Sequence, residues 1–153
     1  MTRPAEQVVA RNRRARHHYD LEASWEAGIV LHGTEVKSLR AGLASLADGF
    51  VDIDGGEVWM HGVHIPPYSQ GSWTNQASRR TRKLLLHRSE IRRLEHRVSE
   101  SRLTIVPLTL YFRDGRAKVE IALARGRRTW DKRQALAERQ AVREAEQALA
   151  KRA

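Results

Sequence analysis

The chain has 153 residues, 41% of them hydrophobic, which is sufficient for one globular domain with its own core and an added tail. Lys and Arg number 28 against 18 Asp and Glu, so the net charge of +10 favours a polyanionic partner, a nucleic acid first and an anionic membrane surface second. No apolar run approaches the roughly 20 residues of a membrane span, no signal-peptide core opens the chain, and without cysteine there is no disulfide framework or Cys-based zinc site. We therefore expect a soluble, cytoplasmic protein with no membrane partner.

The first 18 residues are polar and basic. Arginines crowd at positions 11, 13, 14 and 16, and His17 and His18 end the run. One interpretation is a frayed, solvated terminus, which is usual for the first residues of a domain. The density of arginine favours phosphate contact instead, because a guanidinium matches phosphate oxygens two at a time. We expect a flexible basic segment over residues 1–11, and then a strand over residues 19–31 with a break at Glu22-Ala23-Ser24.

The segment from Gly28 to Gly42 predicts a short strand, a turn at Gly33 and then a helix. Thr34 stands at the expected N-cap, where its hydroxyl can accept a backbone N–H, and Glu35 lies near the positive end of the helix dipole. Gly42 occupies the place of a left-handed C-cap. Two apolar residues three apart give this helix one inward edge and leave three side chains to point outward, toward a partner: Lys37, Ser38 and Arg40.

Two hairpins are predicted from their turn residues. Asp54-Gly55-Gly56 separates two apolar runs, and Asp114-Gly115 separates two others, and all of these turn residues suit the positive φ of a tight turn. Pro107 lacks a ladder donor and predicts an edge or a bulge in the strand over residues 103–112.

Between the hairpins, residues 68–82 lack periodicity, and we expect a mobile loop that orders on a partner. Residues 84–86 predict a brief strand or the lead into a helix, and the spacing of the apolar residues over 89–100 predicts a helix with one face on the core. Together these elements predict a mainly β protein. We expect a small closed antiparallel barrel of the OB type, with two or three short helices, over residues 12–126; such barrels are a common RNA-binding solution.

Residues 127–153 form a tail of strong helix formers without an aligned apolar stripe. A helix without such a stripe cannot be held by packing on the barrel, and an isolated helix is marginal in water. We therefore predict a basic tail that is disordered when free and becomes helical along an anionic surface. On that helix the basic residues fall on one face: Arg128, Lys132, Arg139 and Arg143.

The seven histidines do not form a recognisable metal or catalytic site. His61 and His64 lie three apart in a predicted strand and face opposite sides. The sequence contains no phosphate-binding loop, His-Glu-x-x-His motif or nucleophile elbow. A ribonuclease-like His/Lys pair stays open, although no pattern favours it. We expect a binding protein rather than an enzyme, with no catalytic residue, metal or cofactor.

Several segments resemble the SmpB family, the SsrA-binding proteins, and follow the order of that family: Asn12-Arg13-Arg14-Ala15-Arg16-His17, Glu26-Ala27-Gly28, residues 33–42, Arg82-Lys83-Leu84-Leu85-Leu86-His87, Leu123-Ala124-Arg125-Gly126 and Asp131-Lys132-Arg133. The resemblance implies an OB-like barrel and a tail that is unstructured in solution. It implies binding to the tRNA-like domain of transfer-messenger RNA (tmRNA, or SsrA RNA) and delivery of that RNA, with elongation factor Tu, to stalled ribosomes in trans-translation. There the tail enters the empty mRNA channel beside the decoding centre of the small subunit, and the protein makes no bond itself.

The resemblance also implies site residues. The tmRNA-binding set is Asn12, Arg13, Arg16, Tyr19, Glu26, Glu35, Lys37, Ser38, Arg40, Lys83 and Leu85. The residues implied to contact the decoding centre are His17, Gly126 and Arg128. The residues implied to contact the mRNA channel are Asp131, Lys132 and Arg133, and the basic face of the tail adds Arg139 and Arg143. Glu26 and Glu35 either accept from base amino groups or ribose hydroxyls, or orient a neighbouring arginine. The alternative function is a generic OB-fold RNA-binding protein that prefers unstructured RNA.

Overall fold

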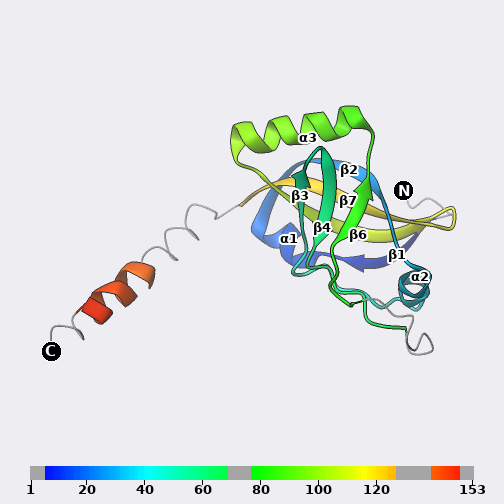
Figure 1. Cartoon of the computed structure of the whole chain (residues 1–153), viewed down its shortest axis with the longest axis horizontal. Helices are drawn as coiled ribbons and strands as arrows, with labels where there is room; N and C mark the ends of the chain where they lie inside the picture. Colours follow the sequence, from blue (N-terminus) through cyan, green and yellow to red (C-terminus); the bar gives the residue numbers. More distant parts are fainter. Residues whose placement is uncertain (1–5, 69–76, 127–138, 149–153) are drawn as a thin grey trace.

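The structure is a computed structural model, and it describes residues 6–68, 77–126 and 139–148. Figure 1 shows a body of strands with the helices at its margins. The named elements are, in chain order, β1 (Glu6–Arg11), α1 (Arg13–His18), β2 (Tyr19–Ile29), α2 (Gly33–Arg40), β3 (Phe50–Asp54), β4 (Glu57–His61), β5 (Arg82–Leu85), α3 (Arg88–Ser101), β6 (Thr104–Arg113) and β7 (Arg116–Gly126).

The strands form one antiparallel sheet that closes on itself. Hydrogen bonds link them in the order β1-β6-β3-β4-β5-β2-β7, and β6 pairs with β7 as well. The pairing of β6 with β7 therefore closes a ring of strands, and β1 lies outside this ring. One edge of β6 pairs with β3 at Ile105 and with β1 from Thr109 to Arg113. The predicted mainly β fold, a small closed antiparallel barrel with short helices, is confirmed.

The turns and bulges explain how the strands register. Asp114 and Gly115 have φ values of 51° and 78°, which a two-residue hairpin turn requires. The register of β6 against β7 shifts between Pro107 and Thr109, which confirms the bulge predicted at the proline. The break expected at residues 22–24 is instead a register shift in β2 just after Leu21, and the strand continues through it.

The prediction of a flexible segment over residues 1–11 is wrong for its second half. Glu6–Arg11 forms β1 and pairs with β6. Val9 and Ala10 pack against the core, and this burial offsets the entropy lost when the segment becomes ordered. Residues 1–5 lie outside the described residues.

The helices close the barrel core. Leu94 of α3 is fully buried, and Ile91 and Val98 pack beside it, which confirms the inward face predicted from their spacing. Leu39 anchors α2 in the same core with 1% of its surface exposed, and burying one leucine stabilises a fold by about 2 kcal/mol. Figure 1 shows α3 across the top of the barrel and α2 at its lower corner. Leu84 and Leu85 form the second half of strand β5, which confirms the first of the two alternatives predicted for residues 84–86, a brief strand.

The tail and the long loop are described only in part. Residues 139–148 are helical and all of them are exposed, as expected of a helix without an apolar stripe. The loop prediction falls largely on residues 69–76, which lie outside the described residues. Among the helices of the described ranges, none combines the length and the apolar character needed to cross a membrane.

Candidate nucleic-acid interface

The residues that the resemblance assigned to RNA contact fall into two groups, and Glu26, in the second half of β2, lies outside both. One group lies on α1 and at the start of β2, and the other lies on α2 and β5. Figure 1 shows α1 and α2 at different ends of the barrel, so the two groups are separate. Each group combines buried polar residues that hold an element in place with exposed residues that face solvent.

Asn12 holds α1 in place. It is buried, with 3% of its surface exposed, and its Oδ1 accepts the backbone N–H of Ala15 at 3.0 Å as an N-cap. Its Nδ2 donates to the carbonyl oxygens of Pro107 and Leu46 at 2.9 and 3.2 Å. Because every polar atom of this side chain is engaged inside the protein, Asn12 is a positioning residue in this structure and not a surface contact.

The exposed side of α1 carries cationic and aromatic groups. Ala15 faces inward with 3% of its surface exposed, while Arg13 and His17 are exposed and their side chains make no hydrogen bond or ion pair within the described part of the chain. Arg16 donates to Thr109 Oγ1 at 3.3 Å and lies 3.4 Å from Glu120 Oε1. Ion pairs at such exposed positions are weak, worth at most about 1 kcal/mol, so a phosphate can compete for this arginine.

The start of the tail lies beside α1. Tyr19, the first residue of β2, is the register partner of Gly126, the last residue of β7. His17 is two residues before Tyr19, so the structure brings together two of the residues assigned to the decoding centre, His17 and Gly126. Arg139 and Arg143 lie on the exposed helix over 139–148. The other assigned tail residues lie outside the described residues: Arg128, Asp131, Lys132 and Arg133.

The N-terminus of α2 differs from the prediction. The N-cap is His32, and its backbone N–H donates to Glu35 Oε1 at 2.9 Å. Thr34, the predicted N-cap, lies inside the first turn, and its buried Oγ1 has no hydrogen-bond partner among the described residues. The C-terminal prediction is confirmed, because Gly42 adopts the left-handed conformation with φ of 77°.

Glu35 binds two arginines under α2. The carboxylate is 4% exposed, and it accepts from Arg80 Nη2 at 2.5 Å and from Arg82 Nε at 2.7 Å. Burial alone would raise the pKa of Glu35, but the hydrogen bonds from Arg80, from the His32 N–H and from Arg82 outweigh it, so this pKa lies below its ordinary value. The structure thus favours the second of the two roles considered for Glu35, the orientation of neighbouring arginines.

The two arginines differ in exposure. Arg82 is fully buried and also donates to the carbonyl oxygens of Val63 at 2.8 Å and Ser78 at 3.2 Å. Arg80 is 22% exposed and donates to the carbonyl oxygen of Val30 at 3.3 Å. Together they connect α2, the end of β2 and the chain before β5. One carboxylate against two guanidiniums leaves a positive charge at this end of the barrel.

The predicted outward residues of α2 are only partly outward. Ser38 is fully buried and its hydroxyl donates to the carbonyl oxygen of Pro66 at 2.6 Å, which corrects the expectation that it faces a partner. Lys37 is exposed, with Nζ 5.6 Å from the ring centroid of Tyr68. Arg40 is also exposed, with its guanidinium 5.0 Å from the ring centroid of Phe112. Lys37 and Arg40 are therefore the side chains that α2 offers to a partner.

Strand β5 adds an outer face next to α2. Its residues alternate, with Arg82 and Leu84 buried and Lys83 and Leu85 facing outward. Leu85 is 53% exposed, and Lys83 Nζ lies 3.2 Å from Glu57 Oε1 in an exposed pair.

Glu26 is a paired carboxylate on the outside of the barrel. It accepts from the hydroxyl of Tyr111 and from Arg113 Nη1 at 2.5 Å. Burial, together with the hydrogen bond to Glu26, raises the pKa of Tyr111, so the phenol stays a donor. Glu26, like Glu35, is therefore occupied by partners within the protein.

The family model described as SmpB protein matches residues 9–151 of the chain. The chain belongs to the SmpB family. The SsrA-binding protein of Nocardioides sp. is 68% identical over 145 residues, which cover 95% of this chain and 91% of that protein. The SsrA-binding protein of Thermobifida fusca is 64% identical, with the same two coverages of 95% and 91%.

A solved SmpB chain supports the fold. It is described as "tmRNA-SmpB: a journey to the center of the bacterial ribosome", and it is 47% identical to this chain with a TM-score of 0.67. The match covers 83% of this chain and 93% of that chain. The barrel described above is thus similar to the SmpB barrel of that solved structure.

Sequence reasoning did not assign Arg80 or Arg82 to the site of this SmpB chain. The basic residues concentrated at positions 79–83 indicate a charged site, but the sequence does not show that their partner is Glu35. Glu35 lies 45 and 47 residues before these arginines in the sequence. Such a pairing follows from the closure of the barrel, which brings β5 beside the end of β2.

Proposed function

We propose that this chain binds the tRNA-like domain of tmRNA and acts in trans-translation, the rescue of stalled ribosomes. The observation that carries the proposal is the division between buried and exposed residues in the assigned set. Its acidic and amide members are buried or paired within the protein, whereas its basic members face solvent: Arg13, Arg16, Lys37, Arg40 and Lys83. Exposed cations on helices and strands that are held in fixed positions can match the phosphates of a folded RNA. The names of the SsrA-binding relatives support the same RNA.

The tail has a second role in this proposal. Because Gly126 is paired with Tyr19, the tail starts beside α1, which carries the exposed His17. The tail would enter the empty mRNA channel and become helical there, with Gly126 and Arg128 near the decoding centre. The residues that would contact the mRNA channel are Asp131, Lys132, Arg133, Arg139 and Arg143. The chain would act in the cytoplasm by binding, with elongation factor Tu in the delivery complex, and would make no covalent bond.

The RNA-binding part is tested with charge-matched variants. Lys37→Ala removes an exposed cation of α2, and Arg93→Ala removes an exposed cation of α3 at another end of the barrel. The affinity for the tRNA-like domain is measured over a series of salt concentrations. We expect Lys37→Ala to weaken binding and to reduce the salt slope by about one charge, and Arg93→Ala to change neither. Equal losses in both variants would mean that net charge alone binds the RNA, as in the generic OB-fold alternative.

The tail is tested by truncation after Gly126. The shortened chain should keep its affinity for the tRNA-like domain and lose ribosome rescue in a reconstituted translation system. A loss of RNA affinity on truncation would contradict the division of labour between barrel and tail.

A further inference from the structure

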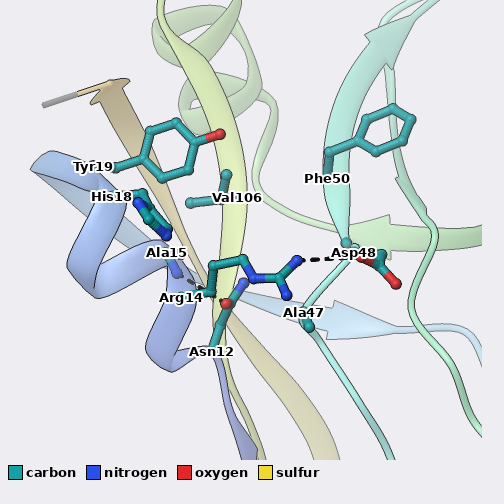
Figure 2. A pocket seen from close by; sticks show the side chains of 10 residues that line it. Asn12, Arg14, Ala15, His18, Tyr19, Ala47, Asp48, Phe50 and Val106 are labelled. Carbon is teal, nitrogen blue, oxygen red and sulfur yellow. Dashed lines mark hydrogen bonds and ion pairs between the residues drawn. The ribbon is translucent and has the colours of Figure 1, made fainter. Parts of the chain in front are cut away.

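A hollow of about 290 Å³ lies beside α1, between β2, β6 and the chain that enters β3. Figure 2 shows Tyr19 and Val106 on one side and Phe50 on the other, with Arg14 reaching across from α1 to Asp48. This volume is at the small end for ligand pockets, which begin at roughly 300 Å³. The hollow therefore suits one planar group and is too small for a helical segment.

Phe50 is an exposed aromatic residue whose ring stacks on a neighbouring histidine. Its surface is 48% exposed, and its ring stacks on His61 with centroids 4.9 Å apart and planes at 18°. The two ring nitrogens of His61 lie 2.7 Å from Asp52 Oδ1 and 3.1 Å from Thr81 Oγ1, so the histidine is fixed in turn. An aromatic side chain has only two torsion angles, so it binds a planar ligand with little loss of side-chain entropy.

The polar groups of the hollow match a nucleotide. Arg14 and Asp48 are 63% and 60% exposed and lie 3.6 Å apart, and a pair this exposed is weak, so the arginine can turn to a phosphate. The carboxylate of Asp48 lines the same hollow, which disfavours a bare phosphate inside it but can accept from the amino group of a base. Aromatic rings beside an arginine are the chemistry that proteins use for unstacked bases.

We propose that this hollow receives one unstacked nucleobase of the bound RNA, stacked on Phe50, with the adjoining phosphate on Arg14. The inference rests on the proposed function for the identity of the RNA. It adds Phe50, Arg14 and Asp48 to the interface, none of which the resemblance assigned. Because every base has a stacking face, the hollow would tolerate more than one base type.

The test uses two variants of one residue. Phe50→Leu keeps an apolar side chain and removes the ring, while Phe50→Tyr keeps the ring. The probe is the tRNA-like domain of tmRNA, and thermal unfolding confirms that each variant folds. We expect Phe50→Leu to weaken binding about tenfold, the usual size of the loss of one base–aromatic stack, and Phe50→Tyr to bind like the unmodified chain. Binding by Phe50→Leu within twofold of the unmodified chain would overturn the proposal.

A second measurement needs no variant. Ultraviolet light links stacked aromatic side chains to bases, and mass spectrometry identifies the linked peptide and nucleotide. A link between one unpaired nucleotide and the peptide with Phe50 supports the proposal, and a link to the peptide with Tyr19 without one to Phe50 contradicts it. If Arg14→Gln weakens binding while Phe50→Leu does not, the hollow binds phosphate only and the base is excluded.

The same titrations separate this inference from the proposed function. If the chain binds the tRNA-like domain tightly and Phe50→Leu does not change the affinity, the proposal of a nucleobase site is refuted while the proposed function stands. Equal affinity for unstructured RNA, with a tenfold loss in Phe50→Leu on both RNAs, overturns the tRNA-like preference and supports the base site.

Discussion

Replacing Glu35 by glutamine keeps the shape of the side chain and removes the charge that Arg80 and Arg82 share. Arg82 is fully buried, so its guanidinium cannot regain water when its partner is neutralised. Removing one partner of a buried ion pair costs about 3–5 kcal/mol. Glutamine still accepts one hydrogen bond and Arg80 is partly exposed, so we expect a loss near the lower end, about 3 kcal/mol.

The assay is urea and thermal unfolding, with Glu57→Gln as the matched control. Glu57 pairs with Lys83 at 3.2 Å, but the two side chains are 49% and 38% exposed, so the control should lose less than about 1 kcal/mol. The melting midpoint of Glu35→Gln should fall by roughly 10 °C. Adding Arg82→Met should cost less than the sum of the two single changes, because no unpaired buried charge remains. A Glu35→Gln chain as stable as Glu57→Gln would refute this reasoning.

Three further predictions concern pH, a cap and a turn. The pKa of Glu35 is lowered from 4.5 in the folded state, so the stability contributed by its ionised carboxylate is complete above that pH and is lost as the pH falls through the lowered pKa. The free energies of unfolding of the unmodified chain and of Glu35→Gln should therefore converge on acidification. A constant difference between the two would contradict this prediction. Asn12→Ala removes the cap of α1 and both N–H groups that donate to buried carbonyls, so urea unfolding should show a loss of about 2 kcal/mol in the free energy of unfolding. A loss below about 0.5 kcal/mol, the size typical of surface substitutions, would mean that Asn12 does not hold α1. Gly62→Ala places a Cβ 2.4 Å from the carbonyl oxygen of Asp48 at φ of 73°, whereas Gly55→Ala at φ of 60° meets nothing within 4 Å. In urea unfolding, Gly62→Ala should lower the free energy of unfolding by more than about 2 kcal/mol and Gly55→Ala by about 1 kcal/mol. Equal losses would mean that the contact with Asp48 adds no steric cost.

The barrel could be predicted because its signals are local. Asp114-Gly115 and Asp54-Gly55-Gly56 determine where two hairpins turn, and Pro107 marks a bulge within its own strand. Each of these turns and bulges depends on the backbone preferences of a few neighbouring residues. The turn signals and the alternation of apolar residues were therefore enough to indicate a closed antiparallel sheet.

The site could be predicted only in its surface residues, because its supports are distant in sequence. The hydroxyl of Ser38 turns inward to a carbonyl 28 residues away, and Glu35 meets Arg82 at a separation of 47 residues. The pairing of β1 with β6 spans still more of the chain. The exposure of Lys37 follows from helix periodicity. The burial of Ser38 on the same helix instead depends on the segment at Pro66, which packs over its hydroxyl only in the folded chain.

The most direct test of the central claim is a competition experiment at moderate salt. The labelled tRNA-like domain of tmRNA is bound by the full chain and challenged with unlabelled tRNA-like domain, with tRNA, and with unstructured RNA of equal length. The account predicts that only the unlabelled tRNA-like domain displaces the label efficiently. Equal displacement by unstructured RNA would contradict it, since charge attraction alone would then explain the binding.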